Sequence, residues 1–166
     1  MSHESNFTDV RSQFGTFRLF SNGRAITKIL LPSQLTDDEP ECDGTDEILP
    51  AATAEFDAYF GGQSNEFQVP YEPEFGTEFQ RDVWLELRRI PVGTTISYSE
   101  LASRVGRPAA VRAVGTANGR NPLPIVVPCH RVIGADGTLT GYAGGLQLKQ
   151  QLLEHEKALQ GAFAAT

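Results

Sequence analysis

The stretch that decides how the second half of this chain folds is Ile125-Val126-Val127-Pro128-Cys129-His130-Arg131-Val132-Ile133. Apolar residues flank a single cysteine, a pattern typical of a buried strand or a buried extended segment. The thiolate is the reactive form of cysteine, and neighbouring cations lower the pKa of a thiol. Because His130 and Arg131 follow Cys129 directly, a reactive cysteine competes here with a cysteine that packs as a small hydrophobe.

Two short helices are predicted upstream of this stretch. Residues 97–100, Ser-Tyr-Ser-Glu, have the spacing of a capping box and predict a helix over 99–105. Gly106-Arg107-Pro108 predicts a turn, after which a second helix is expected over 109–118. Two short helices joined by a glycine-containing turn are typical of a helix-turn-helix, although an ordinary helical hairpin has the same pattern.

The second of these helices is slim, with one long side chain in its middle. Gly115 costs roughly 1 kcal/mol in a helix interior relative to alanine, which suggests the close approach of another backbone. A slim helix fits a narrow space such as the minor groove of DNA. Arg112 is then expected to enter the base stack or to contact a phosphate, the alternative being a plain surface arginine. The small residues around it are Ala113, Gly115, Thr116 and Ala117.

Charge supports a nucleic-acid partner despite the net charge of −7. Residues 1–74 hold 4 basic and 14 acidic side chains, whereas residues 75–166 hold 10 basic and 7 acidic ones, so the net charges are −10 and +3. No acidic residue occurs over 101–135, and such a stretch is a candidate phosphate-binding face, with chance clustering on a solvated helix as the alternative. Its arginines are Arg104, Arg107, Arg112, Arg120 and Arg131.

Three further features surround the cysteine stretch. Asn121 precedes a proline, which favours an extended backbone, and its amide is expected to act as a hinge or as an ordinary turn residue. Residues 140–145 form a glycine-rich loop that is a candidate pocket wall and a weak phosphate signal. A final helix is expected over 146–159. Glu156 on it either orients His130 or is a solvated carboxylate.

The first half reads as a supporting scaffold without a constellation of catalytic groups. Strands are expected over 14–20 and 25–31 around an Asn-Gly turn, a helix over 51–60, and one more short strand over 67–69. Of the two cysteines, Cys42 lies among acidic residues that should raise the pKa of its thiol and leave it unreactive. No disulfide framework, zinc-ligand spacing, membrane span or secretory signal is present, which predicts a cytoplasmic protein with no metal, no cofactor and no membrane partner.

A set of short motifs occurs in a fixed order in the second half: Gly76-Thr77-Glu78-Phe79-Gln80, Val83-Trp84, Ile90-Pro91, Ser97-Tyr98, Arg112-Ala113-Val114-Gly115, Asn121-Pro122, Pro128-Cys129-His130-Arg131-Val132 and Tyr142-Ala143-Gly144-Gly145-Leu146. Together they resemble the methylated-DNA–protein-cysteine methyltransferases, also called O6-alkylguanine-DNA alkyltransferases. The resemblance is strong over 76–156 and holds only in outline before that.

The resemblance implies an α+β protein of two domains. Residues 1–74 would form a scaffold with a small antiparallel sheet and a helix, ribonuclease H-like. Residues 75–166 would form a mostly helical domain with a helix-turn-helix, winged-helix-like, that binds DNA and accepts the alkyl group. The implied partner is double-stranded DNA bearing O6-alkylguanine, bound by a monomer, with cooperative binding along DNA left open.

The implied reaction is direct reversal of damage. The protein would flip O6-methylguanine, and also O4-methylthymine, out of the duplex and move the alkyl group irreversibly to Cys129, once per molecule. His130, held by Glu156, would take the thiol proton through a water. Asn121 would be a hinge, and Tyr98 would assist departure of the guanine and crowd the DNA backbone.

The resemblance also implies a DNA-binding and a base-binding set. Arg112 would fill the gap left by the flipped nucleotide, and the backbone of Cys129, Val132 and Ala143 would read the base. The pocket would include Tyr142 and Thr140. The other residues implied to contact DNA are Tyr98, Ala113, Gly115, Thr116, Ala117 and Arg120.

The chemistry agrees with these roles. Displacement at an alkyl carbon needs a strong nucleophile, for which cysteine is the best side chain, and the guanine oxygen is inaccessible until the base leaves the stack. Two rival classes are a non-catalytic lesion-binding module, which would lack the acceptor cysteine, and a Cys-His-Glu acyl hydrolase, which leaves Arg112 unexplained. A transcription regulator is disfavoured because no second DNA-binding domain is predicted.

Overall fold

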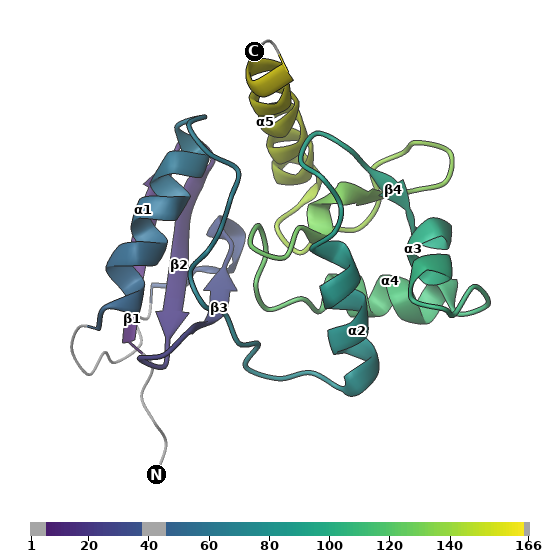
Figure 1. Ribbon diagram of the computed structural model, residues 1–166, viewed down its shortest axis with the longest axis horizontal. Helices are drawn as coiled ribbons and strands as arrows, with labels where there is room; N and C mark the ends of the chain where they lie inside the picture. The colour runs from purple at the N-terminus through teal and green to yellow at the C-terminus, as the bar shows by residue number, and fades with distance from the viewer. Residues whose placement is uncertain (1–5, 38–45, 165–166) are drawn as a thin grey trace. The chain divides into compact units, whose positions relative to one another are not determined.

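The computed structural model describes residues 6–37 and 46–164, with side chains described as far as Lys157 in the last helix. The chain divides into two compact units, residues 1–74 and 75–166, whose elements are labelled in Figure 1. Sheet and helices together make this an α+β protein. Among the described residues, no helix is long and apolar enough to cross a bilayer. Cys42 lies outside the described residues, so its low reactivity stays a prediction.

The first unit is a three-stranded antiparallel sheet with one helix packed on it (Figure 1). Aromatic side chains form its core, with Phe17, Phe56 and Tyr59 almost wholly buried. Arg18 is also buried and pairs with Asp9 across β1 and β2 at 2.7 Å. The elements are β1 (Asn6–Ser12), β2 (Gly15–Ser21), β3 (Ile26–Leu30), the 3-10 turn η1 (Pro32–Gln34) and α1 (Ile48–Phe60).

Two features of this unit differ from the sequence-based expectation. β1 was not expected, because only Val10 in it is buried and a largely polar edge strand gives no clear alternation. Conversely, residues 67–69 are not a strand. The carboxylate of Glu55 accepts the N–H groups of Gln68 and Val69 at 2.6 and 2.7 Å, so these donors are not available to a sheet.

The second unit is mostly helical. The side chain of Thr77 accepts from the backbone of Gln80 and the Gln80 side chain returns the bond, which starts the first helix with a capping box. Trp84 is buried and donates its indole N–H to the carbonyl of Ala117 at 2.8 Å, which ties two helices together. The elements are α2 (Glu78–Leu87), β4 (Ile96–Ser97), α3 (Tyr98–Arg104), α4 (Val111–Gly119), η2 (Cys129–Arg131), β5 (Val132–Ile133) and α5 (Leu146–Ala164).

α3 and α4 form the helix-turn-helix pair. Ser97 caps α3 by accepting from the backbone N–H of Glu100 at 3.1 Å, and Gly106 adopts φ +77° in the connecting turn. Phe79 is half-buried, and the Arg107 guanidinium lies over its ring, 5.8 Å from the centroid. β4 and β5 pair in parallel, with Ile96 opposite Val132, so the start of α3 lies beside the end of the cysteine stretch.

Candidate active site

The cysteine stretch is buried as expected, but it is a series of turns and not a strand. Ile125 has φ +74°, an unusual backbone for a β-branched residue. Pro128 has φ −81° and ψ 68°, an inverse γ-turn in which the Cys129 N–H donates to the Val127 carbonyl at 2.8 Å. The prolines explain the difference, since a residue without an N–H does not fit a central strand. Cys129 therefore stands at the first position of the tight turn η2.

Side-chain amides hold these turns in place. Asn121 donates to the Val127 carbonyl at 2.7 Å and accepts from the Leu123 N–H at 2.9 Å. Asn118, which is buried, donates to the Cys129 carbonyl at 3.3 Å, and its Oδ1 has no hydrogen-bond partner among the described residues. The backbone around Cys129 is thus fixed from the end of α4.

Glu156 is not a solvated carboxylate. It is wholly buried on α5 and bonds to His130 Nε2 at 2.7 Å. Arg131 donates to both of its oxygens, from Nε at 2.8 Å and from Nη2 at 3.0 Å. Burial alone would raise the pKa of Glu156, but His130 and Arg131 outweigh it and hold that pKa far below its usual range. Glu156 is therefore ionised and locks the two residues that follow the cysteine.

The histidine in this network is arranged as a proton acceptor. Its Nδ1 is buried and has no hydrogen-bond partner among the described residues. If His130 donates its Nε2–H to Glu156, Nδ1 carries the lone pair and is free to take a proton.

Cys129 is a free thiol and only 6% exposed. Burial raises the pKa of this thiol, while hydrogen bonding to Asn121 and the charge of Lys149 act in the opposite direction. Tyr142 is half-buried with its hydroxyl inside, and burial of that hydroxyl, with the nearby Cys129 and Glu156, raises the pKa of its phenol well above the usual value. Its hydroxyl has no hydrogen-bond partner among the described residues.

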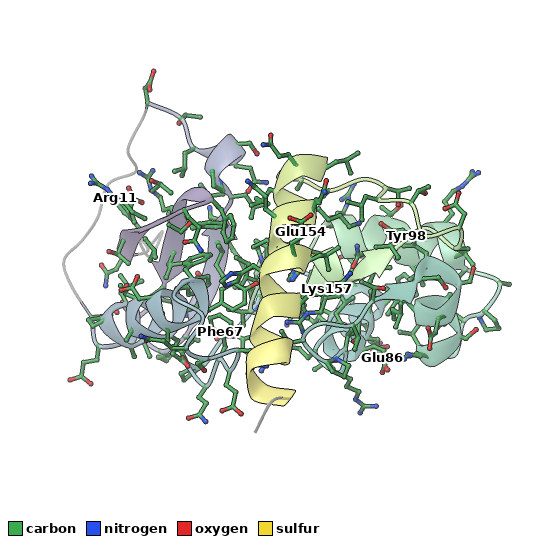
Figure 2. The ribbon with its side chains drawn as sticks, turned by 90° about the horizontal axis from the view of Figure 1, so that it is seen from above. Arg11, Phe67, Glu86, Tyr98, Glu154 and Lys157 are labelled. Carbon is green, nitrogen blue, oxygen red and sulfur yellow. The ribbon has the colours of Figure 1, made fainter. Side chains whose placement is uncertain are left out.

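A cavity of about 530 Å³ opens between α3, α4 and the glycine-rich loop. This volume is in the range of small-molecule sites. Tyr98 of α3 forms part of its wall and is labelled in Figure 2. Other predicted site residues that line it are Arg112, Gly115, Thr116, Thr140, Tyr142 and Ala143.

A second groove, of about 620 Å³, lies between the start of α2 and α4. Arg112 and Thr116 line both hollows, and Ala113 and Ala117 line only this one. Arg120 ends α4 as an exposed residue and lines neither. Cys129, His130 and Val132 are buried and are not among the lining residues of either.

Four residues around Cys129 have positions that the sequence did not predict. Arg131 was expected as a neighbouring cation and as one arginine of the candidate phosphate-binding face, but it is buried against Glu156 and does not lie on an exposed face, because its bonds depend on the folded position of α5. Asn118 did carry a signal, since it is a polar residue at a buried position of an amphipathic helix, next to Ala117, whereas the burial of Lys149 depends on where α5 packs. Arg88 donates to the Val126 carbonyl at 2.6 Å, a contact for which the sequence has no local pattern.

The second unit thus combines a helix-turn-helix pair with a buried free cysteine that lies beside a hydrogen-bonded histidine–glutamate pair. Residues 78–158 match the sequence model described as "6-O-methylguanine DNA methyltransferase, DNA binding domain". The chain belongs to the methylated-DNA–protein-cysteine methyltransferase family.

Relatives and solved structures support this membership over nearly the whole chain. A methylated-DNA–protein-cysteine methyltransferase of Mycolicibacterium paratuberculosis is 45% identical over 91% of this chain and 92% of its own length. One of Methanosarcina acetivorans is 53% identical over 67% of this chain and 70% of its own. The crystal structure of Mycobacterium tuberculosis OGT in complex with DNA has a TM-score of 0.84 and 42% identity, covering 93% of this chain and 94% of that one.

Proposed function

We propose that this protein repairs DNA by moving the alkyl group of O6-alkylguanine, chiefly O6-methylguanine and also O4-methylthymine, to Cys129. The observation that carries the proposal is the turn η2, which presents a buried thiol next to a histidine that Glu156 holds at 2.7 Å. The fold of a relative solved with DNA supports the same partner. In finer terms, we assign a winged-helix-like DNA-binding domain to residues 75–166 and a ribonuclease H-like scaffold to residues 1–74.

The chemistry is a direct displacement. His130 Nδ1 accepts the Cys129 proton through a water, and the thiolate sulfur attacks the alkyl carbon. The carbon–sulfur bond forms as the carbon–O6 bond breaks, and the guanine leaves with the electron pair while Tyr98 assists at its ring nitrogen. A thioether has no good leaving route, so each molecule reacts once.

Access to the base requires that the nucleotide leave the duplex. Arg112 lines both hollows on α4, which supports its assignment as the side chain that fills the space in the base stack. The flipped base enters the cavity beside Tyr98, where the backbone of Cys129, Val132 and Ala143 reads it. Thr140 and Tyr142 complete the pocket wall. The remaining DNA contacts are assigned to Ala113, Gly115, Thr116, Ala117 and Arg120, with the protein acting as a monomer.

Intact-protein mass spectrometry tests this proposal. After incubation with a duplex carrying one O6-methylguanine, we expect each molecule to gain the mass of one methylene group and then to stop reacting. Cys129→Ser should gain nothing. Continued turnover, or an adduct that survives in Cys129→Ser, would rule the proposal out.

Gly115 offers a test of the DNA-facing role of α4. A Cβ at this position would meet the Tyr98 ring at 3.6 Å, an ordinary contact, so the fold itself does not demand glycine there. We expect Gly115→Ala to raise the free energy of unfolding by up to about 1 kcal/mol. Affinity for duplex DNA should fall, because the added methyl lies on the helix that we place in the groove. Thermal unfolding measures the change in stability, and fluorescence anisotropy measures the affinity for DNA. An unchanged affinity would contradict the placement of α4 in the DNA groove.

A further inference from the structure

The cations next to Cys129 in the sequence are already engaged in the structure. Arg131 binds both oxygens of Glu156, so their charges compensate each other. His130 also bonds to Glu156 and carries a charge only when protonated. A thiolate at Cys129 is buried, and a buried anion is costly unless a cation is paired with it. When His130 takes the thiol proton, the imidazolium that forms lies against Glu156 and is partly neutralised by it, so a further positive group near the turn would stabilise the thiolate.

Lys149 is such a group. Its side chain is wholly buried, which is rare for lysine, and its Nζ donates to the Thr140 carbonyl at 2.8 Å. The Nζ also lies 5.9 Å from the centroid of the Tyr98 ring. No carboxylate among the described residues lies within salt-bridge distance of it. Burial lowers the pKa of Lys149, and the charge of Cys129 acts in the opposite direction.

The helix places Lys149 on the face of α5 that also carries Glu156, the partner of His130. Lys149 and Glu156 are seven residues apart, which puts both on one face of α5 about 10 Å from each other. Leu152 lies between them and is also buried. This face packs on η2, whereas Glu154 and Lys157, labelled in Figure 2, are exposed on the other side of α5. The partners of Lys149, Thr140 and Tyr98, both line the 530 Å³ cavity.

We propose that Lys149 supplies the positive charge that stabilises the Cys129 thiolate, so that proton transfer to His130 leaves a buried thiolate–ammonium pair behind the base pocket. This inference rests on the alkyl transfer proposed above. Lys149 acts on the reacting sulfur through its charge and is a positioning residue. The other titratable or charged groups of the elements packed around the turn and Lys149 are His130 and Arg131 on η2, Glu156 on α5, Tyr142 on the loop, Tyr98 on α3, and Arg88, just after α2, which bonds to the Val126 carbonyl.

The pH dependence of the reaction distinguishes an effect of the Lys149 charge from an effect of its packing. A cation lowers the pKa of a neighbouring thiol, so its removal moves the reactive range to higher pH. With the free base O6-benzylguanine as alkyl donor, we expect Lys149→Met to shift the midpoint of the rate–pH curve upward by about one unit. The rate near neutral pH should fall about ten-fold and approach that of the unmodified chain at high pH. Lys149→Arg should keep the original midpoint.

Lys157→Met is the matched control, because Lys157 is an exposed lysine of the same helix, and its midpoint should not move. A rate that falls equally at every pH in Lys149→Met, with an unchanged midpoint, would overturn the inference and leave a packing role. If the unmodified chain gained no alkyl group at all, the proposed function would fail instead.

A second measurement needs no substitution. Alkylation replaces the ionisable thiol by a neutral thioether, so Lys149 loses the group that can become its anionic partner. We expect the pKa of the Lys149 ammonium, followed by NMR of the side chain, to be lower in the methylated protein than in the unmodified one. Equal pKa values in the two forms would overturn the inference.

Discussion

Glu156→Gln is expected to lower the free energy of unfolding by about 3–5 kcal/mol, the usual cost of removing one partner of a buried ion pair. Glutamine has nearly the same shape, but it leaves Arg131 without a counter-charge in a wholly buried site. It also removes the carboxylate that orients His130, so alkyl transfer should become very slow at every pH. Urea unfolding and the mass assay measure the two effects.

The stabilising effect of Glu156 should depend on pH. His130 and Arg131 hold the pKa of Glu156 below that of a free glutamate despite its burial. Such a group stabilises the fold above its unfolded pKa of about 4.3, and the contribution is lost as the pH falls further. The unmodified chain should therefore lose stability steeply below about pH 4, and Glu156→Gln should lose less over the same range. Glu154→Gln, at an exposed position of α5, is the control, and parallel curves for all three would contradict the assignment.

Arg112→Ala is expected to reduce repair of duplex DNA by roughly 10- to 100-fold, since extruding a base costs a few kcal/mol and each 1.4 kcal/mol is tenfold. Reaction with free O6-benzylguanine should be almost unchanged, because that substrate needs no extrusion. The difference between the two substrates is the informative quantity.

Rates of Cys129 alkylation on the two substrates, measured by mass, check this result. Arg120→Ala is a suitable comparison, because Arg120 is an exposed arginine at the end of the same helix that lines neither hollow. Arg120→Ala should weaken binding to duplex DNA modestly. It should not slow the reaction with duplex DNA beyond this loss of binding, because Arg120 does not take part in extruding the base. Equal losses on duplex and free base in Arg112→Ala would show that Arg112 does not act on the base stack.

The helices were predictable because their signals are local. Ser97 caps α3 as its sequence spacing indicated, and Thr77 caps α2 with the same local pattern. The turns at Ile125 and Pro128 were not predicted, since an apolar run alone does not distinguish a strand from buried turns. The pairing of Glu156 with Arg131 and the burial of Lys149 depend on where α5 packs, and no local pattern encodes that. The two hollows beside α4 likewise could not be predicted from the sequence, because residues from several elements form their walls.

The parallel pair of β4 and β5 has a consequence for how the chain tolerates change. Tyr98 follows directly on Ser97, and Cys129 lies one tight turn before Val132. The pairing of β4 with β5 therefore fixes the positions of both side chains relative to each other. Inserting or deleting a single residue at either junction would move one of them by a full backbone step relative to the other. We therefore expect natural length variation to be absent from both junctions.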